Sequence, residues 1–287
     1  MSSTTGSTPP SARPVRRAAV LTHGRPETIG PALQRVEAAA RASGVELVFP
    51  PDEVSKHEIQ EVPHELADAD LVLVLGGDGT MLRALHRLLG TDIPAIGVNF
   101  GRVGFLTAIT ESGLAEQLAR VFAGEHRVIE LPTLELELDG ERAQAINDVV
   151  AASATVGRMV ELSWSVGGEL LGRQACDGII CATPPGSTAY NLSNGGPVLV
   201  WGLDAMAVTF IAPHSLHARS MVVPRGLDVV VTNETPDVAA AVLYDGHRLG
   251  EIPPAGAVVV RLGEQRSLLA TLPEVTFFRR YRNTFTS

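Results

Sequence analysis

The sequence Leu71-Val72-Leu73-Val74-Leu75-Gly76-Gly77-Asp78-Gly79-Thr80 contains the transition that decides the fold. Its uninterrupted apolar run, followed by a glycine turn, predicts a strand of a parallel sheet buried on both faces. The next segment, Met81–Gly90, has leucines at helical spacing and ends at a glycine, which predicts a helix. Asp78 therefore lies where the carboxyl end of a strand meets the start of a helix. In open α/β sheets this is where ligands bind.

The turn allows two interpretations. We expect its glycines, Gly76, Gly77 and Gly79, to permit positive φ angles and a close approach of a ligand to the backbone. Backbone N–H groups at the start of a helix also suit a phosphate. Alternatively, Asp78 or Thr80 caps the helix and has no part in chemistry.

The composition restricts the class of protein. A chain of 287 residues with 45% hydrophobic content predicts one large or two ordinary domains with a real core. The net charge of −9 and the pI near 5.4 argue against nucleic acid or an anionic membrane surface as a main partner. Lys56 is the one lysine, so the Gly-Lys-Ser/Thr end of a Walker-type loop is absent. A phosphate would have to be bound by backbone N–H groups, arginines and a divalent cation.

Cysteine and histidine usage gives no sign of a structural metal. Cys176 and Cys181 have neither a disulfide framework nor zinc spacing, so we expect buried, small apolar side chains in a reducing cytoplasm. The eight histidines form no ligand cluster, and we predict no metal site made by the protein alone. No apolar run is long enough for a membrane span. Residues 1–14, rich in Ser, Thr and Pro, predict a disordered tail.

Strands and helices alternate in the first half of the chain, which predicts a parallel sheet with right-handed crossovers. We expect strands at 18–21, 45–49, 71–75 and 93–98, helices at 29–42 and 81–90, and a mobile connection at 50–66. Glu46 places its strand near the edge of the sheet, because a central strand of this type is apolar throughout.

Near residue 131 the hydrophobic period changes to two, which is typical of antiparallel strands with one polar face. The alternation is clearest at 134–138 and 160–166, and Gly167-Gly168 predicts a hairpin. Further strands are expected at 227–232, 239–244, 257–261 and 268–272. The predicted fold class is α/β plus all-β: an open parallel α/β domain over 15–130, a β-rich antiparallel domain over 131–270, and a C-terminal segment, 271–287, that returns to pack on the first domain.

A second dense segment is Asp177–Tyr190, followed by Asn191–Pro197. A short apolar strand leads into a rigid Pro-Pro-Gly turn, and two hydroxyls and a phenol follow. Hydroxyl, amide and aromatic groups beside a glycine-rich turn suit a nucleotide. A polar loop with a half-buried tyrosine is the alternative interpretation.

These segments together resemble the NAD kinase family. Gly-Gly-Asp-Gly-Thr at 76–80 is also similar to the turn of diacylglycerol- and sphingosine-type lipid kinases and, more loosely, of phosphofructokinases. The 177–197 segment resembles a second signature of NAD kinases, which lipid kinases do not share. The resemblance extends from about residue 15 to 285 and includes 97–106, 147–150, 213–216, 244–246 and 277–282. Pro185, where the family usually has Thr, and Asn194, where a small residue is common, depart from the pattern.

The resemblance implies phosphorylation of the 2′-hydroxyl of the adenosine ribose of NAD, which gives NADP. ATP or polyphosphate would be the phosphoryl donor, accompanied by Mg²⁺ or another divalent cation. Asp78 would be the catalytic general base, and Gly79 would let the dinucleotide approach the backbone. The residues implied in binding the dinucleotide are Gly79, Arg83, Phe105, Asn147, Asp148, Arg158, Asp177, Thr188, Ala189, Tyr190, Asn191, Leu192, Ser193, Asp245 and His247.

The resemblance also implies a cytoplasmic homodimer or homotetramer, because Asp177 matches a position that reaches a dinucleotide partly bound by a neighbouring subunit. Two alternatives stay open. A lipid kinase with the same turn would need an apolar groove and a basic membrane-facing patch. A non-catalytic dinucleotide sensor would keep the pocket and should lack the base. The sequence does not choose between ATP and polyphosphate, or between NAD and NADH.

Overall fold

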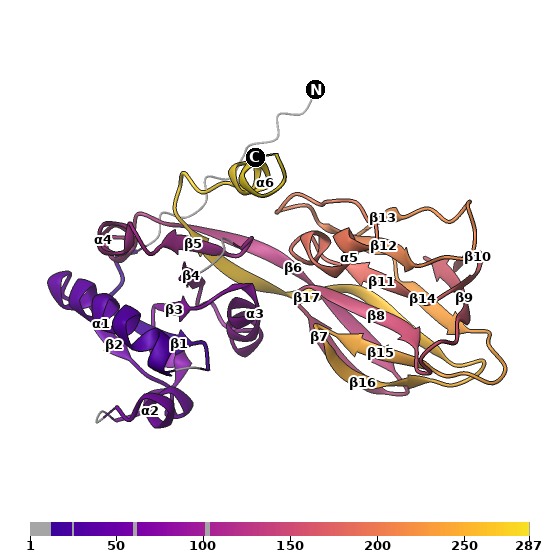
Figure 1. Cartoon of the computed structure of the whole chain (residues 1–287), viewed down its shortest axis with the longest axis horizontal. Coiled ribbons are helices and arrows are strands. Elements are labelled where there is room, and N and C mark those ends of the chain that lie inside the picture. The colour runs from indigo at the N-terminus through magenta and orange to yellow at the C-terminus, as the bar shows by residue number, and fades with distance from the viewer. Residues whose placement is uncertain (1–12, 25, 60–61, 101–103, 287) are drawn as a thin grey trace. The chain divides into compact units, whose positions relative to one another are not determined.

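The computed structural model describes residues 13–24, 26–59, 62–100 and 104–286 (Figure 1). Residues 1–12 of the predicted tail, and residues 101–103 of the 97–106 segment, lie outside these described residues. The chain divides into two compact units: unit 1 contains Met1–Glu130 and Leu268–Ser287, and unit 2 contains Leu131–Ser267. Within the described residues, none of the helices has the length and apolar content needed to cross a membrane.

Unit 1 is built on a parallel sheet with the strand order β2-β1-β3-β4-β5. The bounds are β1 (Arg17–Thr22), β2 (Glu46–Val48), β3 (Leu71–Leu75), β4 (Ala95–Asn99) and β5 (Thr107–Thr110). Leu269, near the end of β17 (Ala257–Thr271), also pairs in parallel with Ala95 of β4. The short strand β2, which carries Glu46, lies at the edge of the sheet, and this confirms the position predicted for it.

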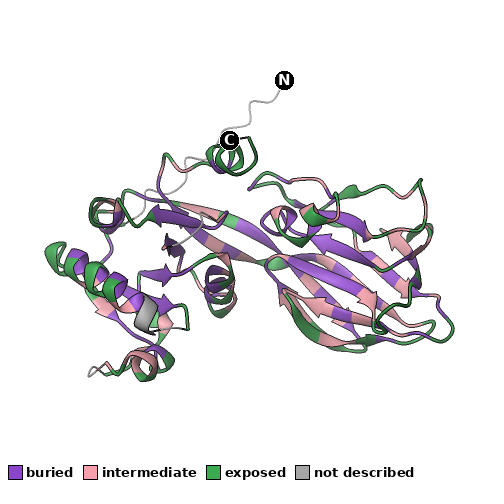
Figure 2. Ribbon diagram, viewed as in Figure 1, coloured by how far each residue is buried: buried purple, intermediate pink, exposed green. Residues whose placement is uncertain are grey.

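Every residue of β3 is buried, as its apolar run predicts (Figure 2). Alternate side chains of β3, beginning with Leu71, share one core cluster with Leu33 of α1 and Leu118 of α4. The helices and 3₁₀ turn of unit 1 are α1 (Pro26–Ala42), α2 (Pro51–His57), η1 (Leu66–Asp68), α3 (Asp78–Arg87), α4 (Leu114–Phe122) and α6 (Phe277–Phe285).

The predicted mobile connection at 50–66 is wrong, because the segment contains α2 and the start of η1. Proline stands at the first turn of α2, acidic residues follow it, and Lys56 and His57 occupy the last turn, which is the charge order that favours a helix. A two-turn helix is too short to show a hydrophobic period. Its buried residue is the carboxylate Glu53, which a search for apolar spacing does not detect.

Unit 2 consists of two antiparallel sheets that pack face to face. One sheet has the order β13-β12-β11-β8-β15-β16, and the other contains β10-β9-β14-β17, with β6 pairing with β17 and β7. Valine, leucine and isoleucine side chains from both sheets form one core cluster. The bounds are β6 (Arg127–Leu138), β7 (Glu141–Ala145), β8 (Asp148–Ser153), β9 (Val160–Val166), β10 (Glu169–Cys176), β11 (Gly178–Ala182), β12 (Ala205–Ile211), β13 (Met221–Pro224), β14 (Val229–Asn233), β15 (Ala240–Tyr244) and β16 (His247–Ile252), with η2 (Gly186–Thr188) and α5 (Tyr190–Ser193) between them.

The predicted fold class, an α/β unit followed by a β-rich antiparallel unit, is confirmed. The hairpin predicted at Gly167-Gly168 is also confirmed, because Val166 pairs with Glu169 and both glycines have positive φ. The prediction of two separate strands at 257–261 and 268–272 is wrong, because one strand, β17, runs through both segments. The polar residues between the two segments are typical of a turn, which explains the wrong prediction. In the structure Gln265 lies within the strand, and its carbonyl oxygen accepts a 2.7 Å hydrogen bond from Thr133 Oγ1.

Candidate active site

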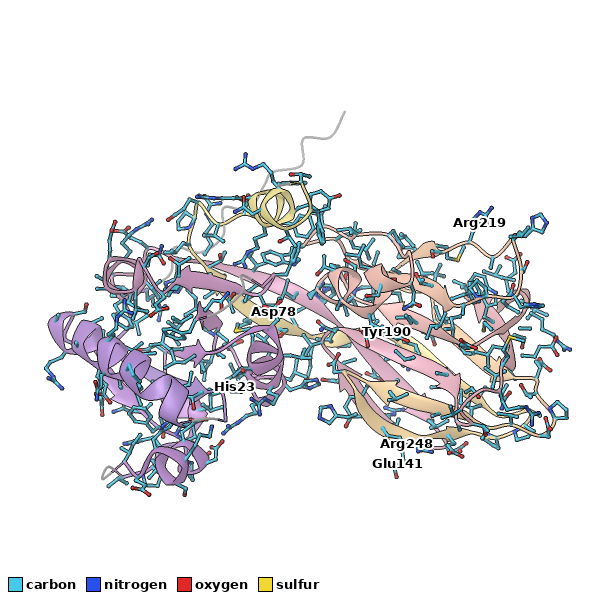
Figure 3. The ribbon with its side chains drawn as sticks, viewed as in Figure 1. His23, Asp78, Glu141, Tyr190, Arg219 and Arg248 are labelled. Atoms are coloured by element: carbon cyan, nitrogen blue, oxygen red, sulfur yellow. The ribbon has the colours of Figure 1, made fainter. Side chains whose placement is uncertain are left out.

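Asp78 is the first residue of α3, and Gly76 and Gly77 separate it from the buried strand β3 (Figure 3). Its carboxylate accepts two backbone hydrogen bonds from a distant loop, from Phe105 N to Oδ2 at 2.7 Å and from Leu106 N to Oδ1 at 3.0 Å. The start of α3 has no side-chain cap. The alternative in which Asp78 only caps its own helix is therefore wrong. The Asp78 carboxylate is half-buried, and the two hydrogen bonds fix its orientation at the carboxyl edge of the sheet.

The glycines around Asp78 act through space and not through positive φ. None of Gly76, Gly77 and Gly79 has a positive φ, so that expectation is wrong. A Cβ on Gly76 would lie 2.6 Å from Thr80 Oγ1, whereas Gly77 and Gly79 have open space at this position. Gly76 is thus required for the packing of Thr80, and Gly79 leaves an exposed, unobstructed backbone next to the carboxylate.

Gly104 and Phe105 complete the surroundings of this carboxylate. A Cβ on Gly104 would lie 2.1 Å from Asp78 Oδ1, so the carboxylate occupies the space that any side chain would need. The ring of Phe105, which we predicted to contact the dinucleotide, is buried against Phe277 and Phe285 of α6, with centroids 5.9 and 5.5 Å away. The part of Phe105 that serves the site is therefore its backbone N–H group.

Arg83 is exposed on α3 and lines a pocket of about 240 Å³ together with Lys56 and Arg87. Buried Glu53 lies at the base of this pocket and accepts hydrogen bonds from Thr22 Oγ1 at 2.6 Å and from Lys56 Nζ at 2.5 Å. Two of the three basic side chains are paired within the pocket, Lys56 with Glu53 at 2.5 Å and Arg87 with Asp52 at 2.9 Å. Arg83 is therefore the basic side chain of this pocket best placed to meet an anionic group.

In unit 2, Asn147 and Asp148 lie where the chain enters β8, and Asp245 fixes the backbone around them. The Asp245 carboxylate accepts hydrogen bonds from the N–H groups of Ile146 (2.6 Å), Asn147 (2.7 Å) and Asp148 (3.0 Å). Asp245 has a φ of 46° in the turn between β15 and β16, a conformation that Asp tolerates better than most residues. Asp245 thus shapes the loop that presents Asn147.

The side chain of Asp148 is itself buried. Burial and, second, the negative charge of Asp245 raise the pKa of Asp148 to about 7. Near neutral pH this carboxyl group is therefore divided between its protonated and ionised forms, so it can either donate or accept a hydrogen bond.

Thr183 and Gly186 also contact the backbone of Asn147. The carbonyl of Asn147 accepts from Thr183 N at 2.9 Å, and Thr183 Oγ1 donates to the carbonyl of Ile146 at 2.6 Å. A Cβ on Gly186 would lie 2.0 Å from the Asn147 carbonyl oxygen. The side-chain oxygen of Asn147 is buried and has no hydrogen-bond partner among the described residues. It is therefore an acceptor ready for an N–H donor of a ligand.

The segment after Gly186 divides into exposed and buried residues. Ala189, Tyr190 (Figure 3) and Ser193 are exposed, while Thr188 and Leu192 are half-buried. Asn191 is fully buried, and its side chain bonds to the carbonyls of Ser187 and Pro197 and to the Thr209 hydroxyl. We therefore assign Asn191 to fixing the turn and not to a ligand.

The remaining predicted residues are exposed in unit 2. Arg158 is paired with Asp237 at 2.8 Å, and the ring centroid of His247 lies 5.8 Å from that of Tyr244. Asp177 follows β10, with its backbone bonded to Ile211 and Ser153. The structure thus brings Asp78 and Phe105 together in unit 1, and Asn147, Asp148 and Asp245 together in unit 2.

Sequence reasoning missed Gly104, Thr183 and Arg280, which contact the segments around Asp78 and Asn147. Arg280 lies one helical turn after Phe277, and this spacing of an arginine and an apolar residue on one face is a signal that could have revealed it. Gly104 and Thr183 stand within segments that resemble the family, yet only the fold shows what they contact.

Cys176 and Cys181 are buried and free, which confirms their predicted character. Burial raises the pKa of each thiol to about 12, so neither is reactive at neutral pH. Across the part of the chain that the structure describes, no three His, Cys, Asp or Glu side chains gather in a way that could bind a metal ion.

Comparison with known proteins gives matches over most of the chain. Residues 31–126 match the family model of the ATP-NAD kinase N-terminal domain, and residues 146–272 match that of the ATP-NAD kinase C-terminal domain. The NAD kinase of Heliobacterium modesticaldum is 39% identical over 224 residues, which are 76% of this chain and 79% of the relative. The NAD kinase of Corynebacterium diphtheriae is 32% identical over 279 residues, which are 91% of this chain and 88% of the relative.

Solved structures agree with these matches. An NAD kinase from Archaeoglobus fulgidus in complex with ATP aligns with a TM-score of 0.72 at 28% identity, over 94% of this chain and 97% of that one. A yeast NADH kinase complexed with NADH has the same fold, with a TM-score of 0.82 at 22% identity, over 98% of this chain and 92% of that one. On the family models and the curated relatives, the chain belongs to the NAD kinase family of enzymes.

Proposed function

We propose that this protein phosphorylates the 2′-hydroxyl of the adenosine ribose of NAD and so forms NADP. The observation that carries the proposal is the Asp78 carboxylate, fixed by two backbone N–H groups at the carboxyl edge of the parallel sheet. Phosphoryl transfer requires an oriented hydroxyl, an acceptor for its proton and neutralisation of the phosphate charge. Asp78 is the proton acceptor in this scheme.

Each Asp78 oxygen accepts one backbone hydrogen bond and keeps a second lone pair for the substrate. As the ribose oxygen bonds to the terminal phosphorus of the donor, its proton passes to Asp78 and the bond from that phosphorus to the bridging oxygen breaks. With ATP as donor, ADP leaves. Mg²⁺ or another divalent cation on the donor phosphates would supply positive charge.

Unit 2 offers groups that suit the dinucleotide. The buried acceptor Asn147 Oδ1 fits the amino group of adenine, and Asp148 can bond a ribose hydroxyl in either protonation state. Exposed Tyr190 presents a ring on which a base can stack. The solved relatives in complex with ATP and with NADH support small nucleotide ligands for this chain.

The donor is ATP in our proposal, with polyphosphate as the second candidate. Exposed Arg83 is the candidate contact for the phosphates of either donor, because Lys56 and Arg87 in the same pocket are paired with Glu53 and Asp52. We also propose a homodimer or homotetramer, which light scattering at several protein concentrations tests directly.

The first experiment measures NADP formation by the purified protein from NAD and Mg²⁺, with ATP and polyphosphate in parallel. The variant Asp78→Asn should lower kcat by about 10²–10⁴-fold and leave the KM for NAD nearly unchanged. Asp92→Asn, a change at an exposed carboxylate just after α3, is the matched control.

Three results would contradict the proposal. Wild-type kcat in Asp78→Asn would contradict the role of Asp78 as the general base. Tight NAD binding without NADP from either donor would identify a non-catalytic sensor. Phosphorylation of diacylglycerol in place of NAD would identify a lipid kinase.

A further inference from the structure

Helix α6 buries an arginine among its aromatic residues. Arg280 is 4% exposed and lies one turn after Phe277, the other buried residue of the helix. The helix begins at a defined cap, because the Thr276 side chain accepts a 3.2 Å hydrogen bond from Arg279 N. The segment before it is anchored to α4, where Arg120 pairs with Glu274 at 2.7 Å. Arg280 is therefore presented from a fixed support.

The guanidinium of Arg280 is directed at the loop that binds Asp78. Nη1 donates to the carbonyl of Thr107 and lies 3.5 Å from the carbonyl of Gly104. These two carbonyls bracket Phe105 and Leu106, whose N–H groups bind the Asp78 carboxylate. The arginine and the aspartate thus bind opposite sides of the same four-residue loop.

One peptide group takes part in both interactions. The Gly104 carbonyl and the Phe105 N–H belong to a single peptide unit, which faces the guanidinium at its oxygen and Asp78 at its hydrogen. A donor at the carbonyl end of a peptide polarises the N–H at the other end and strengthens the bond that it donates. Packing of the Phe105 ring on Phe277 and Phe285 adds a second link between α6 and this loop.

We propose that Arg280 is a positioning residue for phosphoryl transfer, which fixes the Gly104–Thr107 loop so that its N–H groups orient Asp78. The proposal rests on the proposed role of Asp78 as the base. Arg280 does not touch the substrate in this scheme, and it acts through the backbone of the loop.

The guanidinium group of Arg280 stays positively charged at neutral pH. Burial lowers the pKa of Arg280 to about 10, and the negative charge of Asp78 acts in the opposite direction. At neutral pH the guanidinium is therefore ionised. A neutral replacement of similar length, Arg280→Met, removes both the charge and the donors, whereas Arg280→Lys keeps the charge and loses the planar fork.

The test compares Arg280→Met and Arg280→Lys with Arg282→Met, a matched change at an exposed arginine of the same helix. Displacement of a reacting group by about 1 Å costs up to about 100-fold in rate. We expect Arg280→Met to lower kcat by ~10–100-fold with little change in the KM for NAD. Arg280→Lys should lose less, and Arg282→Met should match the wild type. Wild-type kcat in Arg280→Met would overturn the proposal.

A double-mutant cycle with Asp78→Asn separates positioning from a general loss of structure. If Arg280 acts through Asp78, adding Arg280→Met to Asp78→Asn lowers the residual kcat no further. The same fold-loss in both backgrounds would overturn the proposal and leave the role of Asp78 intact. Full activity of Asp78→Asn alone would instead overturn the proposed function.

Hydrogen exchange gives a readout that does not depend on turnover. In the ligand-free protein, the N–H groups of Phe105 and Leu106 should exchange at least about tenfold faster in Arg280→Met than in Arg282→Met, because the loop loses an anchor. Equal exchange rates in the two variants would overturn the proposal. If Arg280→Met does not fold, the same comparison is made with Arg280→Lys.

Discussion

Replacement of Asp148 by Asn should change how the stability of unit 2 depends on pH. The pKa of Asp148 is raised from its ordinary 3.8 to about 7 by burial and by the charge of Asp245. Between pH 3.8 and about pH 7, Asp148 therefore keeps its proton in the folded state and has lost it in the unfolded chain. The stability from this group is fully present below pH 3.8 and is lost as the pH rises through 7.

Each pH unit between these two pKa values costs about 1.4 kcal/mol, so the whole interval corresponds to on the order of 4 kcal/mol. Asn resembles the protonated carboxyl group and does not titrate. The free energy of unfolding of Asp148→Asn minus that of the wild type should thus increase by this amount between about pH 4 and pH 8. Contributions from titrating groups that do not interact with Asp148, such as His126, cancel in the difference.

Urea unfolding followed by tryptophan fluorescence measures this difference, because both tryptophans, Trp164 and Trp201, lie in unit 2. Asp139→Asn, a change at an exposed turn carboxylate of the same unit, is the control and should show no such trend. A difference between Asp148→Asn and wild type that stays constant with pH would refute the reasoning.

Three further predictions concern packing. Gly104→Ala should lower kcat by about 10²-fold, because its Cβ would displace the Asp78 carboxylate from the N–H groups that bind it. Steady-state kinetics check this, and wild-type kcat would contradict it. Gly186→Ala should cost about 1–3 kcal/mol and raise the KM for NAD, since its Cβ meets the Asn147 backbone; urea unfolding measures the first effect and initial rates the second. Cys176 and Cys181 should resist iodoacetamide at pH 7.5 in the folded protein and react in urea, as mass spectrometry would show.

The sequence predicts those parts of the fold that rest on local patterns. The apolar run of β3 and the alternation of β9 identify their strands, and two glycines identify the hairpin after β9. Local patterns fail at α2, which is too short to show a period, and within β17, where polar residues remain in an extended strand. Within β17, contacts with neighbouring strands override the local signal. At α2 the order of charges favours the helix, and only the hydrophobic period is missing.

In the candidate site, too, local patterns predict the position of a residue but not its distant contacts. The position of Asp78 follows from the strand and turn around it. The groups that bind its carboxylate are backbone N–H groups, which nearly every residue type has, so the sequence does not identify them. The Asp245 bonds to the Asn147 loop join residues almost a hundred positions apart. Pairings of this kind depend on the completed topology and cannot be read from spacing.

The discontinuity of unit 1 has a consequence for the growing chain on the ribosome. Residues 268–287 belong to the same unit as residues 1–130, and they supply Arg280 and the end of β17. The amino-terminal part of the unit is synthesised first, yet it must wait for the whole of unit 2 before its last strand and helix emerge. The Gly104–Thr107 loop thus acquires its contact with Arg280 only after residues 268–287 have been synthesised. A chain that stops after unit 2 would contain every residue of the Gly-Gly-Asp-Gly-Thr turn and would lack Arg280.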